Sequence, residues 1–187
     1  MQKPSDDIAR SQRGDTAAFG RVVRAHYAYA YSLALRLVCD EAEARDVAQE
    51  SFLRVWQNLD RFDPATRFTT WLYRIVTNLS LDAIRSRKRR GAIAAVIPEG
   101  MDPPDRITPE TLATSRDIGR IIEALAGDLP ETQRLVFTLR DMQDLSIEEV
   151  CDITGLSSES VRSNLHYARR RLRERLALEY QVRGTTT

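Results

Sequence analysis

A glycine separates two helical patterns in the segment LSIEEVCDITGLSSESVRSNLHYARRRL. Ser146 precedes Glu149 by three residues, which is the spacing of a capping box at the start of a helix. Gly155 then allows a tight turn, and Ser157 or Ser158 can cap a second helix. The apolar residues of that second helix recur at helical spacing and predict one buried face: Val161, Leu165, Ala168, Leu172 and Leu176. The pattern predicts a helix-turn-helix, whose second helix enters the major groove of DNA.

The outward face of this second helix carries hydrogen-bond donors and positive charge. Arg162 can donate two bonds to guanine, Asn164 can pair with adenine, and Ser163 can contact a base or a phosphate. Arginines farther along lie where the helix leaves the groove, and we expect them to contact phosphates: Arg169, Arg170 and Arg173. A solvated basic helix without a ligand is the alternative, but the preceding cap and turn favour DNA binding.

Helical patterns also dominate the rest of the chain, and strand signals are nearly absent. Before the helix-turn-helix we expect helices over about 15–38, 42–59, 69–90, 115–127 and from 130 onward. A turn marked by Asp63 and Pro64 separates the second helix from the third.

The segment 91–114 differs from its surroundings. It holds four of the chain's seven prolines and an excess of acidic residues, which is typical of an extended linker without a core of its own. The sequence therefore predicts an all-α protein of two small helical domains, 1–90 and 115–187, joined by a flexible linker.

A second basic site lies in TRFTTWLYRIVTNLSLDAIRSRKRR. Aromatic faces beside positive charge suit unstacked bases, because each stacked base contributes roughly 1–3 kcal/mol and the cations follow the backbone. Phe68 and Trp71 are candidates for this stacking, although either ring could instead belong to the core. The adjoining RFDPATRF is a loop in the right place to hold an extruded base.

The stretch DEAEARDVAQESFLRVWQNL has the opposite charge character. Residues 40–50 carry five acids against one arginine, so this face would repel DNA. A buried stripe is predicted on one side of the helix, and a polar stripe with Leu53 near its centre on another. Such a polar face is either simply solvated or binds a protein with a basic helical surface, and the residues alone leave both readings open.

Several classes of function are disfavoured by the sequence. Cys39 and Cys151 lie in helical, apolar-flanked sequence and are interpreted as small core residues in a reducing compartment. The two histidines have no Cys or His at ligand spacing, so we expect no metal site. Without a signal-peptide core or a run of about 18 apolar residues, we expect a cytoplasmic protein with no membrane insertion. No nucleophile–base pair or Gly-rich phosphate loop is evident, so we expect neither an enzyme nor a cofactor.

Taken together, these segments resemble the bacterial sigma factors of the extracytoplasmic-function (ECF) class, the small two-domain promoter-recognition subunits of RNA polymerase. The resemblance runs from RGDTAAF to ARRRLRERL. Three stretches in series carry it: ARDVAQESFLRVWQNLDRF, FTTWLYRIVTNLSLDAIRSRKRR and LPETQRLVFTLRDMQDLSIEEV.

The resemblance implies three sets of binding residues. One set would bind the clamp helices of the largest polymerase subunit: Asp46, Gln49, Glu50, Leu53, Arg54 and Gln57. A second would recognise and melt the −10 element: Arg61, Arg67, Phe68, Thr70, Trp71, Arg74, Asn78, Arg85, Lys88 and Arg89. A third would read the −35 element: Ser160, Arg162, Ser163, Asn164, His166, Tyr167, Arg169 and Arg170. Asn164 and Tyr167 stand where many relatives place arginine, so the base preferences of relatives do not carry over.

The implied partners are the RNA polymerase core, through its clamp helices and flap, promoter DNA and an anti-sigma factor. The implied function is to direct the polymerase to −35 and −10 elements in a stress or envelope response. Two alternatives belong to other classes. A stand-alone helix-turn-helix regulator would need a dimerisation helix for paired half-sites, and none is evident. A sigma mimic that only sequesters an anti-sigma factor would have no use for the basic residues 87–90 and 169–175.

Overall fold

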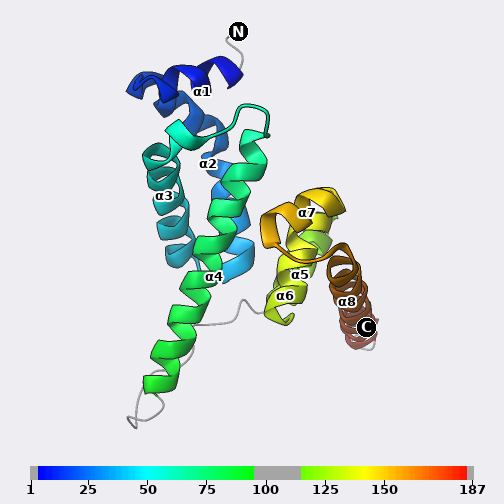
Figure 1. The fold of residues 1–187 in the computed structure, drawn as a ribbon. Coiled ribbons are helices and arrows are strands. Elements are labelled where there is room, and N and C mark those ends of the chain that lie inside the picture. The colour runs from blue at the N-terminus through cyan, green and yellow to red at the C-terminus, as the bar shows by residue number, and fades with distance from the viewer. Residues whose placement is uncertain (1–3, 95–114, 185–187) are drawn as a thin grey trace. The chain divides into compact units, whose positions relative to one another are not determined.

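The computed structural model describes the backbone of residues 4–94 and 115–184 and the side chains of residues 6–90 and 121–178. All regular structure in these ranges is helical, which confirms the predicted fold class. The chain divides into two compact units, Met1–Arg87 and Lys88–Thr187. From the N-terminus, Figure 1 shows α1 (Pro4–Gln12), α2 (Thr16–Val38), α3 (Glu41–Gln57), the short turn η1 (Leu59–Arg61, not labelled in the figure) and α4 (Phe68–Ala94). The second set of elements is α5 (Ser115–Gly127), α6 (Glu131–Phe137), η2 (Thr138–Met142), α7 (Ile147–Thr154) and α8 (Ser158–Gly184).

The first unit is built on α2 and α3, which pack against each other. Both begin at aspartate caps: the Asp15 carboxylate accepts from the Ala18 amide at 2.9 Å, and Asp40 accepts from the Glu43 amide at 2.8 Å. Between the two helices, Cys39 adopts the left-handed conformation with φ of 56°. Cys39 is exposed, so its predicted place in the core is wrong, because the turn that joins the helices directs this residue outward.

The helix α1 is an element that the sequence pattern did not predict. The Arg21 guanidinium donates to both oxygens of the Asp7 carboxylate, at 2.6 and 3.1 Å, and so joins α2 to α1. The hydrogen bond from Arg21 holds the pKa of Asp7 below its usual range. A small helix with little apolar surface is thus held in place by an ion pair with its neighbour.

The boundaries of α3 and α4 differ slightly from expectation. α3 ends at Gln57, and the turn η1 carries the chain onward through Leu59, which is buried. α4 begins at Phe68 rather than after a Thr69 or Thr70 cap, and it continues past the expected end at Arg90 to Ala94. The first four residues of the predicted linker are therefore helical, and the rest of that segment, residues 95–114, lies outside the described residues.

The second unit contains the predicted helix-turn-helix. The Ser146 hydroxyl accepts from the Glu149 amide at 3.1 Å, and the Glu149 carboxylate accepts from the Ser146 amide at 2.9 Å, which completes the capping box of α7. Gly155 ends α7 with φ of 72°, a conformation that favours glycine. The predicted stripe of α8 faces the core: Val161, Leu165, Ala168 and Leu172 are buried, and Leu176 is half-buried.

Two further features of the second unit were not predicted. The residues Thr138–Met142 continue α6 as a π-helix, so the chain winds more widely before the turn to α7. Arg134 is buried, and its guanidinium donates to the Gly127 carbonyl at 2.8 Å. This bond satisfies a backbone acceptor at the end of α5.

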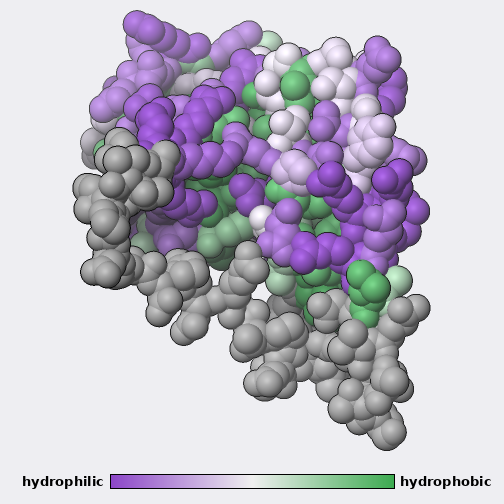
Figure 2. Space-filling model, turned by 90° about the horizontal axis from the view of Figure 1, so that it is seen from below, coloured by the Kyte–Doolittle hydropathy of each residue, from purple (hydrophilic) through white to green (hydrophobic). Residues whose placement is uncertain are grey.

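Hydrophilic side chains cover much of the described surface visible in Figure 2, with smaller apolar areas between them. None of the helices in the described ranges combines the length and apolar character required to cross a lipid bilayer.

Replacing Ser146 by alanine tests whether the capping box stabilises the helix-turn-helix. We expect Ser146→Ala to lower the free energy of unfolding by about 1 kcal/mol, because the Glu149 amide loses its acceptor. The matched control is Ser163→Ala, at an exposed position inside α8, where alanine favours the helix and no stability should be lost. Urea unfolding followed by circular dichroism measures both. Equal stability of the two variants would contradict a role for the cap.

Candidate nucleic-acid and protein interfaces

The outer face of α8 carries the residues predicted to read DNA. Because the opposite face is buried, most of the predicted set is solvent-exposed: Arg162, Ser163, His166, Tyr167, Arg169 and Arg170. Ser160 and Asn164 are half-buried, and the Asn164 amide donates to the Ser160 carbonyl one turn earlier at 2.9 Å. This bond occupies one donor of the Asn164 amide.

Aromatic and cationic groups form a small cluster in the middle of this face. Tyr167 is 46 % exposed, and its ring meets the His166 ring edge to face at 5.6 Å. The Arg170 guanidinium carbon lies 5.9 Å from the centre of the Tyr167 ring. A nitrogen of the same guanidinium forms an ion pair with the Glu174 carboxylate at 3.3 Å. The cluster presents a broad, partly aromatic surface with positive charge at its edge.

Arg169 differs from its arginine neighbours on α8. Its guanidinium donates to both oxygens of Asp141, at 2.8 and 2.7 Å, and so ties α8 to η2. The hydrogen bond to Asp141 raises the pKa of Arg169. The structure thus places Arg169 in a bidentate ion pair inside its own unit, and no local sequence pattern predicts this pair.

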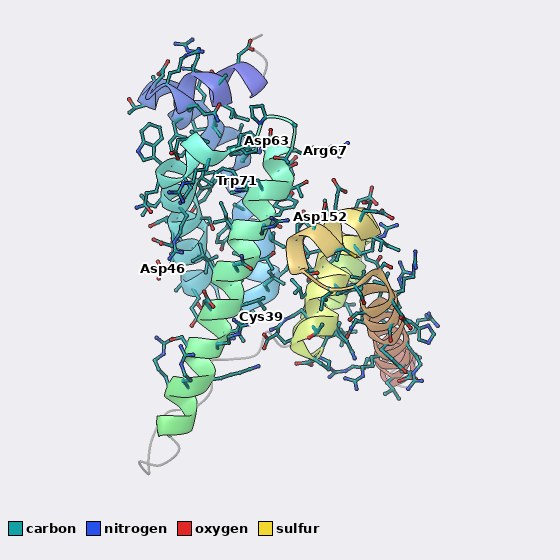
Figure 3. All side chains as sticks on the ribbon, viewed as in Figure 1. Cys39, Asp46, Asp63, Arg67, Trp71 and Asp152 are labelled. Atoms are coloured by element: carbon teal, nitrogen blue, oxygen red, sulfur yellow. The ribbon has the colours of Figure 1, made fainter. Side chains whose placement is uncertain are left out.

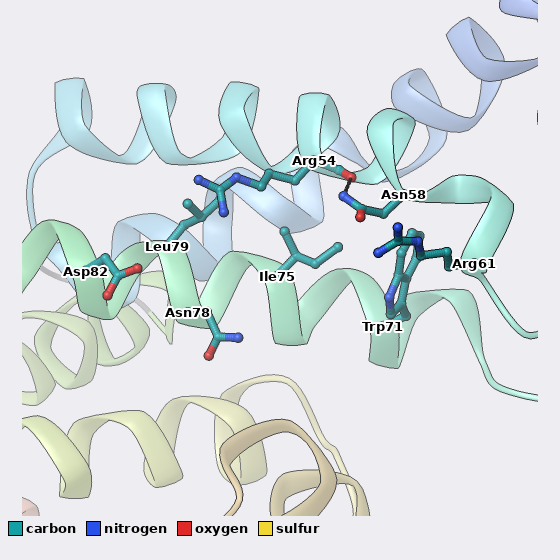
Figure 4. A pocket seen from close by; sticks show the side chains of 8 residues that line it. All are labelled: Arg54, Asn58, Arg61, Trp71, Ile75, Asn78, Leu79 and Asp82. Atoms are coloured by element: carbon teal, nitrogen blue, oxygen red, sulfur yellow. Dashed lines mark hydrogen bonds between the residues drawn. The ribbon is translucent and has the colours of Figure 1, made fainter.

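In the first unit, an open cleft lies between α3 and α4, with a volume of about 290 Å³. Figure 4 shows its lining: Arg54, Asn58, Arg61, Trp71, Ile75, Asn78, Leu79 and Asp82. Three of these belong to the predicted −10 set, namely Arg61, Trp71 and Asn78, whereas Arg54 belongs to the predicted polymerase set. The cleft combines an indole ring, guanidinium groups and amides, which can stack on a base and contact its edges and phosphates.

An aromatic cluster supports the Trp71 end of the cleft. The half-buried Trp71 ring lies 5.1 Å from the Phe62 ring and 6.0 Å from the Phe68 ring, centre to centre. Phe68 is only 7 % exposed and packs 5.1 Å from the His26 ring. Phe68 is therefore a core residue. Its burial contradicts the predicted stacking of this ring on DNA, because Phe62 and His26 cover it. Burial also lowers the pKa of His26.

The remaining residues of the predicted −10 set are spread along α4 and the loop before it. Asp63 shapes this loop, because its carboxylate accepts from the Ala65 amide at 2.9 Å in a turn that the Asp-Pro pair predicted. Arg67 lies at the N-terminal end of α4, with Trp71 about one turn onward (Figure 3). The structure does not bring the whole set into one site, and its other members follow the helix: Thr70, Arg74, Arg85, Lys88 and Arg89. Of these, Thr70 is half-buried and the others are exposed.

The predicted polymerase set shares one exposed face of α3, on which Figure 3 marks Asp46. All members are exposed except Glu50, which is half-buried and accepts from Arg54 at 2.9 Å. Leu53 is 56 % exposed, which is unusual for a large apolar side chain. Trp56, which sequence reasoning missed, is 38 % exposed, and its ring lies 4.8 Å from the Phe19 ring of α2, centre to centre, at a tilt of 48°. Residues three apart on a helix lie on the same side, so the spacing from Leu53 to Trp56 could have predicted that Trp56 lies beside Leu53 on this surface.

Metal binding receives no support from the geometry of the described side chains. Within residues 6–90 and 121–178, no three His, Cys, Asp or Glu side chains are grouped so as to hold a metal ion.

Comparison with protein families matches both units. Residues 22–90 match Sigma-70 region 2, and residues 119–172 match Sigma-70, region 4. The ECF RNA polymerase sigma factor SigW of Bacillus subtilis is 33 % identical to this chain, over 90 % of this chain and 94 % of the relative. The ECF sigma factor SigE of Mycolicibacterium smegmatis is 35 % identical, over 94 % of this chain and 69 % of the relative.

Solved structures support the fold. CnrH in complex with the cytosolic domain of CnrY is 26 % identical, has a TM-score of 0.67 and covers 93 % of this chain and 97 % of that one. The sigma factor RpoE of Bartonella quintana, solved with the anti-sigma factor NepR, has a TM-score of 0.69 at 19 % identity, and the match covers 85 % of this chain and 96 % of that one.

The family matches fall on the two helical units found in the structure, and together they cover the α3–α4 cleft and the helix-turn-helix. Sigma factors supply binding selectivity and not catalysis, in agreement with the expectation of a non-enzyme. The chain belongs to the ECF class of sigma-70 family RNA polymerase sigma factors, the subunits that direct the polymerase to promoters.

Proposed function

We propose that this sigma factor divides promoter opening among three separate surfaces. The outer face of α8 reads the −35 element, while the α3–α4 cleft and the loop before α4 hold an unstacked base of the −10 element. The acidic face of α3 binds the clamp helices of the polymerase core. In this proposal the domains are residues 1–90 and 115–187, with 91–114 as the connection between them.

One observation carries this division of labour, namely the separation of charge among exposed helix faces. On α8, Arg162 and Arg170 are exposed beside His166 and Tyr167. On α3, the exposed face begins with acidic residues and has Leu53 farther along. A cationic face is attracted to DNA phosphates and an anionic face is repelled by them, so the two kinds of face suit different partners.

Melting follows from the capture of a base. Unpairing and unstacking a base costs a few kcal/mol, which stacking on an aromatic ring of the protein offsets in part. Trp71 is the proposed platform, because its ring is half-buried beside Phe62 and lines an open cleft with Arg61 and Asn78.

The remaining partners rest on relatives. The RpoE structure contains an anti-sigma factor, and we extend this kind of regulation to the present chain. We also propose contact of the second domain with the polymerase flap, a cytoplasmic location in a bacterium, and use in a stress or envelope response.

Replacing Arg162 by alanine tests the −35 surface. We expect the Arg162→Ala holoenzyme to bind promoter DNA roughly 5- to 150-fold more weakly, because a bidentate contact to a base contributes about 1–3 kcal/mol. Arg171→Ala removes the same charge from another exposed position of α8 and should change affinity far less. Electrophoretic mobility shifts with promoter DNA and with the same DNA carrying a scrambled −35 element measure both. Equal losses in the two variants would contradict base reading by Arg162.

Replacing Asp46 or Leu53 by alanine tests the polymerase surface. We expect Leu53→Ala to weaken binding to core polymerase by roughly fivefold or more, because an exposed leucine buried at an interface contributes at least about 1 kcal/mol. Asp46→Ala should weaken the same binding without a selective loss of promoter affinity. Leu178→Ala, at a leucine of α8 that is 61 % exposed, is the matched control. If Asp46→Ala and Arg162→Ala impaired the same step, the division of labour would be wrong.

Arg169 and Arg170 are adjacent but differ in their pairing, which gives a further test. We expect Arg170→Ala to reduce the dependence of log affinity on log salt concentration by about 1, as a lost phosphate contact does. Arg169→Ala should change that slope much less, because Asp141 already neutralises this guanidinium through two short bonds. Salt titrations of holoenzyme binding to promoter DNA measure both slopes. A larger change for Arg169→Ala would contradict this assignment.

A further inference from the structure

The last residue of α1 reaches across the first unit to the segment that follows α3. The Gln12 side-chain amide donates at 3.0 Å to the Leu59 carbonyl and at 3.0 Å to the Phe62 carbonyl. A glutamine amide has two N–H donors, so both are used by a segment about 50 residues farther along the chain. One side chain therefore joins α1 to both ends of a short turn.

This turn contributes Arg61 to the lining of the α3–α4 cleft, and the adjoining Phe62 packs against Trp71, a second lining residue. Arg61 is the last residue of η1 and lines the cleft. The Phe62 ring lies directly against Trp71, at 5.1 Å between ring centres. Figure 4 shows Arg61 and Trp71 at the same end of the cleft. Gln12 thus holds the backbone on both sides of Arg61, including the residue whose ring packs against the Trp71 indole.

Apart from the packing of Leu59 and Phe62, few hydrogen bonds hold the turn. Its own backbone supplies two bonds, from the Arg61 amide to the Asn58 carbonyl at 3.0 Å and from the Phe62 amide to the Leu59 carbonyl at 3.2 Å. Leu59 and Phe62 are buried, and the Leu59 carbonyl accepts from Gln12 as well as from the Phe62 amide. The Phe62 carbonyl would lose the donor that Gln12 supplies, which is costly for a buried acceptor. Short turns of this kind fray easily unless a side chain from another element satisfies their ends.

The helix that presents Gln12 is itself fixed. Asp7 pairs with Arg21 through two bonds, and Arg10 pairs with Asp15 at 2.7 Å just beyond the end of α1. These ion pairs hold the middle and the last turn of α1 against α2 and its cap, so the amide of Gln12 has a defined position. A side chain on an anchored helix can orient a loop before any ligand arrives.

We infer that Gln12 is a positioning residue for −10 recognition: it holds the η1 turn so that Arg61 and Trp71 stand ready to receive an unstacked base. This inference rests on the proposed function of the cleft. Without the two bonds, the turn samples other conformations, and part of the binding energy of the base must be spent on ordering it.

The test replaces Gln12 by alanine in the full chain and assembles holoenzyme with core polymerase. We expect Gln12→Ala to reduce the equilibrium constant for promoter opening by about fivefold or more, the lower limit of a lost base-stacking contact. Permanganate reactivity of −10 thymines measures opening. Affinity for core polymerase and protection of the −35 element should stay unchanged, since neither surface contains this turn.

Two further variants separate positioning from a general loss of structure. Gln12→Lys keeps a hydrogen-bond donor of similar reach and should restore most of the opening. Thr16→Ala truncates an exposed, uncharged residue near the end of α1 and should open promoters like the parent protein. All variants are compared at a temperature where circular dichroism shows them to be folded.

The outcomes distinguish this inference from the proposed function. Trp71→Ala tests base capture itself, and if it opened promoters normally, the proposed function of the cleft would fail. If Trp71→Ala impaired opening while Gln12→Ala did not, only the role of Gln12 would be overturned. The role of Gln12 would also be overturned if Gln12→Ala weakened binding to core polymerase as much as it reduced promoter opening. Failure of Gln12→Lys to restore promoter opening would overturn it as well.

Discussion

Each helix buries one apolar face, and this burial decides which side chains are left for binding. A helix that packs one face leaves the opposite face to solvent, so the residues buried by α8 decide which of its residues meet a partner. Val161 and Leu165 are buried, and Arg162, His166 and Tyr167 are consequently exposed. The same rule operates on α3, where burial of Phe52 and Val55 leaves Leu53 exposed. The proposed binding surfaces of α8 and α3 are therefore the faces that the two cores do not use.

Bonds between distant elements then adjust these faces. The Asp141 carboxylate takes both donors of Arg169 that face it, which leaves Arg170 as the more available neighbouring charge. In the first unit, Gln12 and the Phe62 ring determine where Trp71 and Arg61 stand. Helix packing thus determines which faces are exposed, and a few polar side chains determine which charges and rings on those faces can bind a partner.

Local patterns in the sequence were sufficient to predict much of this fold. The capping box at Ser146, the turn at Gly155 and the stripe that begins at Val161 are spaced within one or two helical turns, and the structure confirms them. Contacts between segments far apart in the chain have no comparable signal. Periodicity predicted that Phe68 could pack, but not that His26 and Phe62 would cover it. The αL turn at Cys39, the pairing of Asp141 with Arg169 and the helix α1 depend on tertiary neighbours in the same way.

In the proposed mechanism, two cationic surfaces on one chain select promoters by recognising two separate DNA elements while a third surface binds the polymerase. The most direct test of this mechanism is transcription of genomic DNA by core polymerase with and without the purified chain, with the 5′ ends of all transcripts sequenced. If this mechanism operates, we expect a new set of start sites that share two upstream elements at a constant spacing. Start sites that match those of core polymerase alone, or that share only one element, would contradict it.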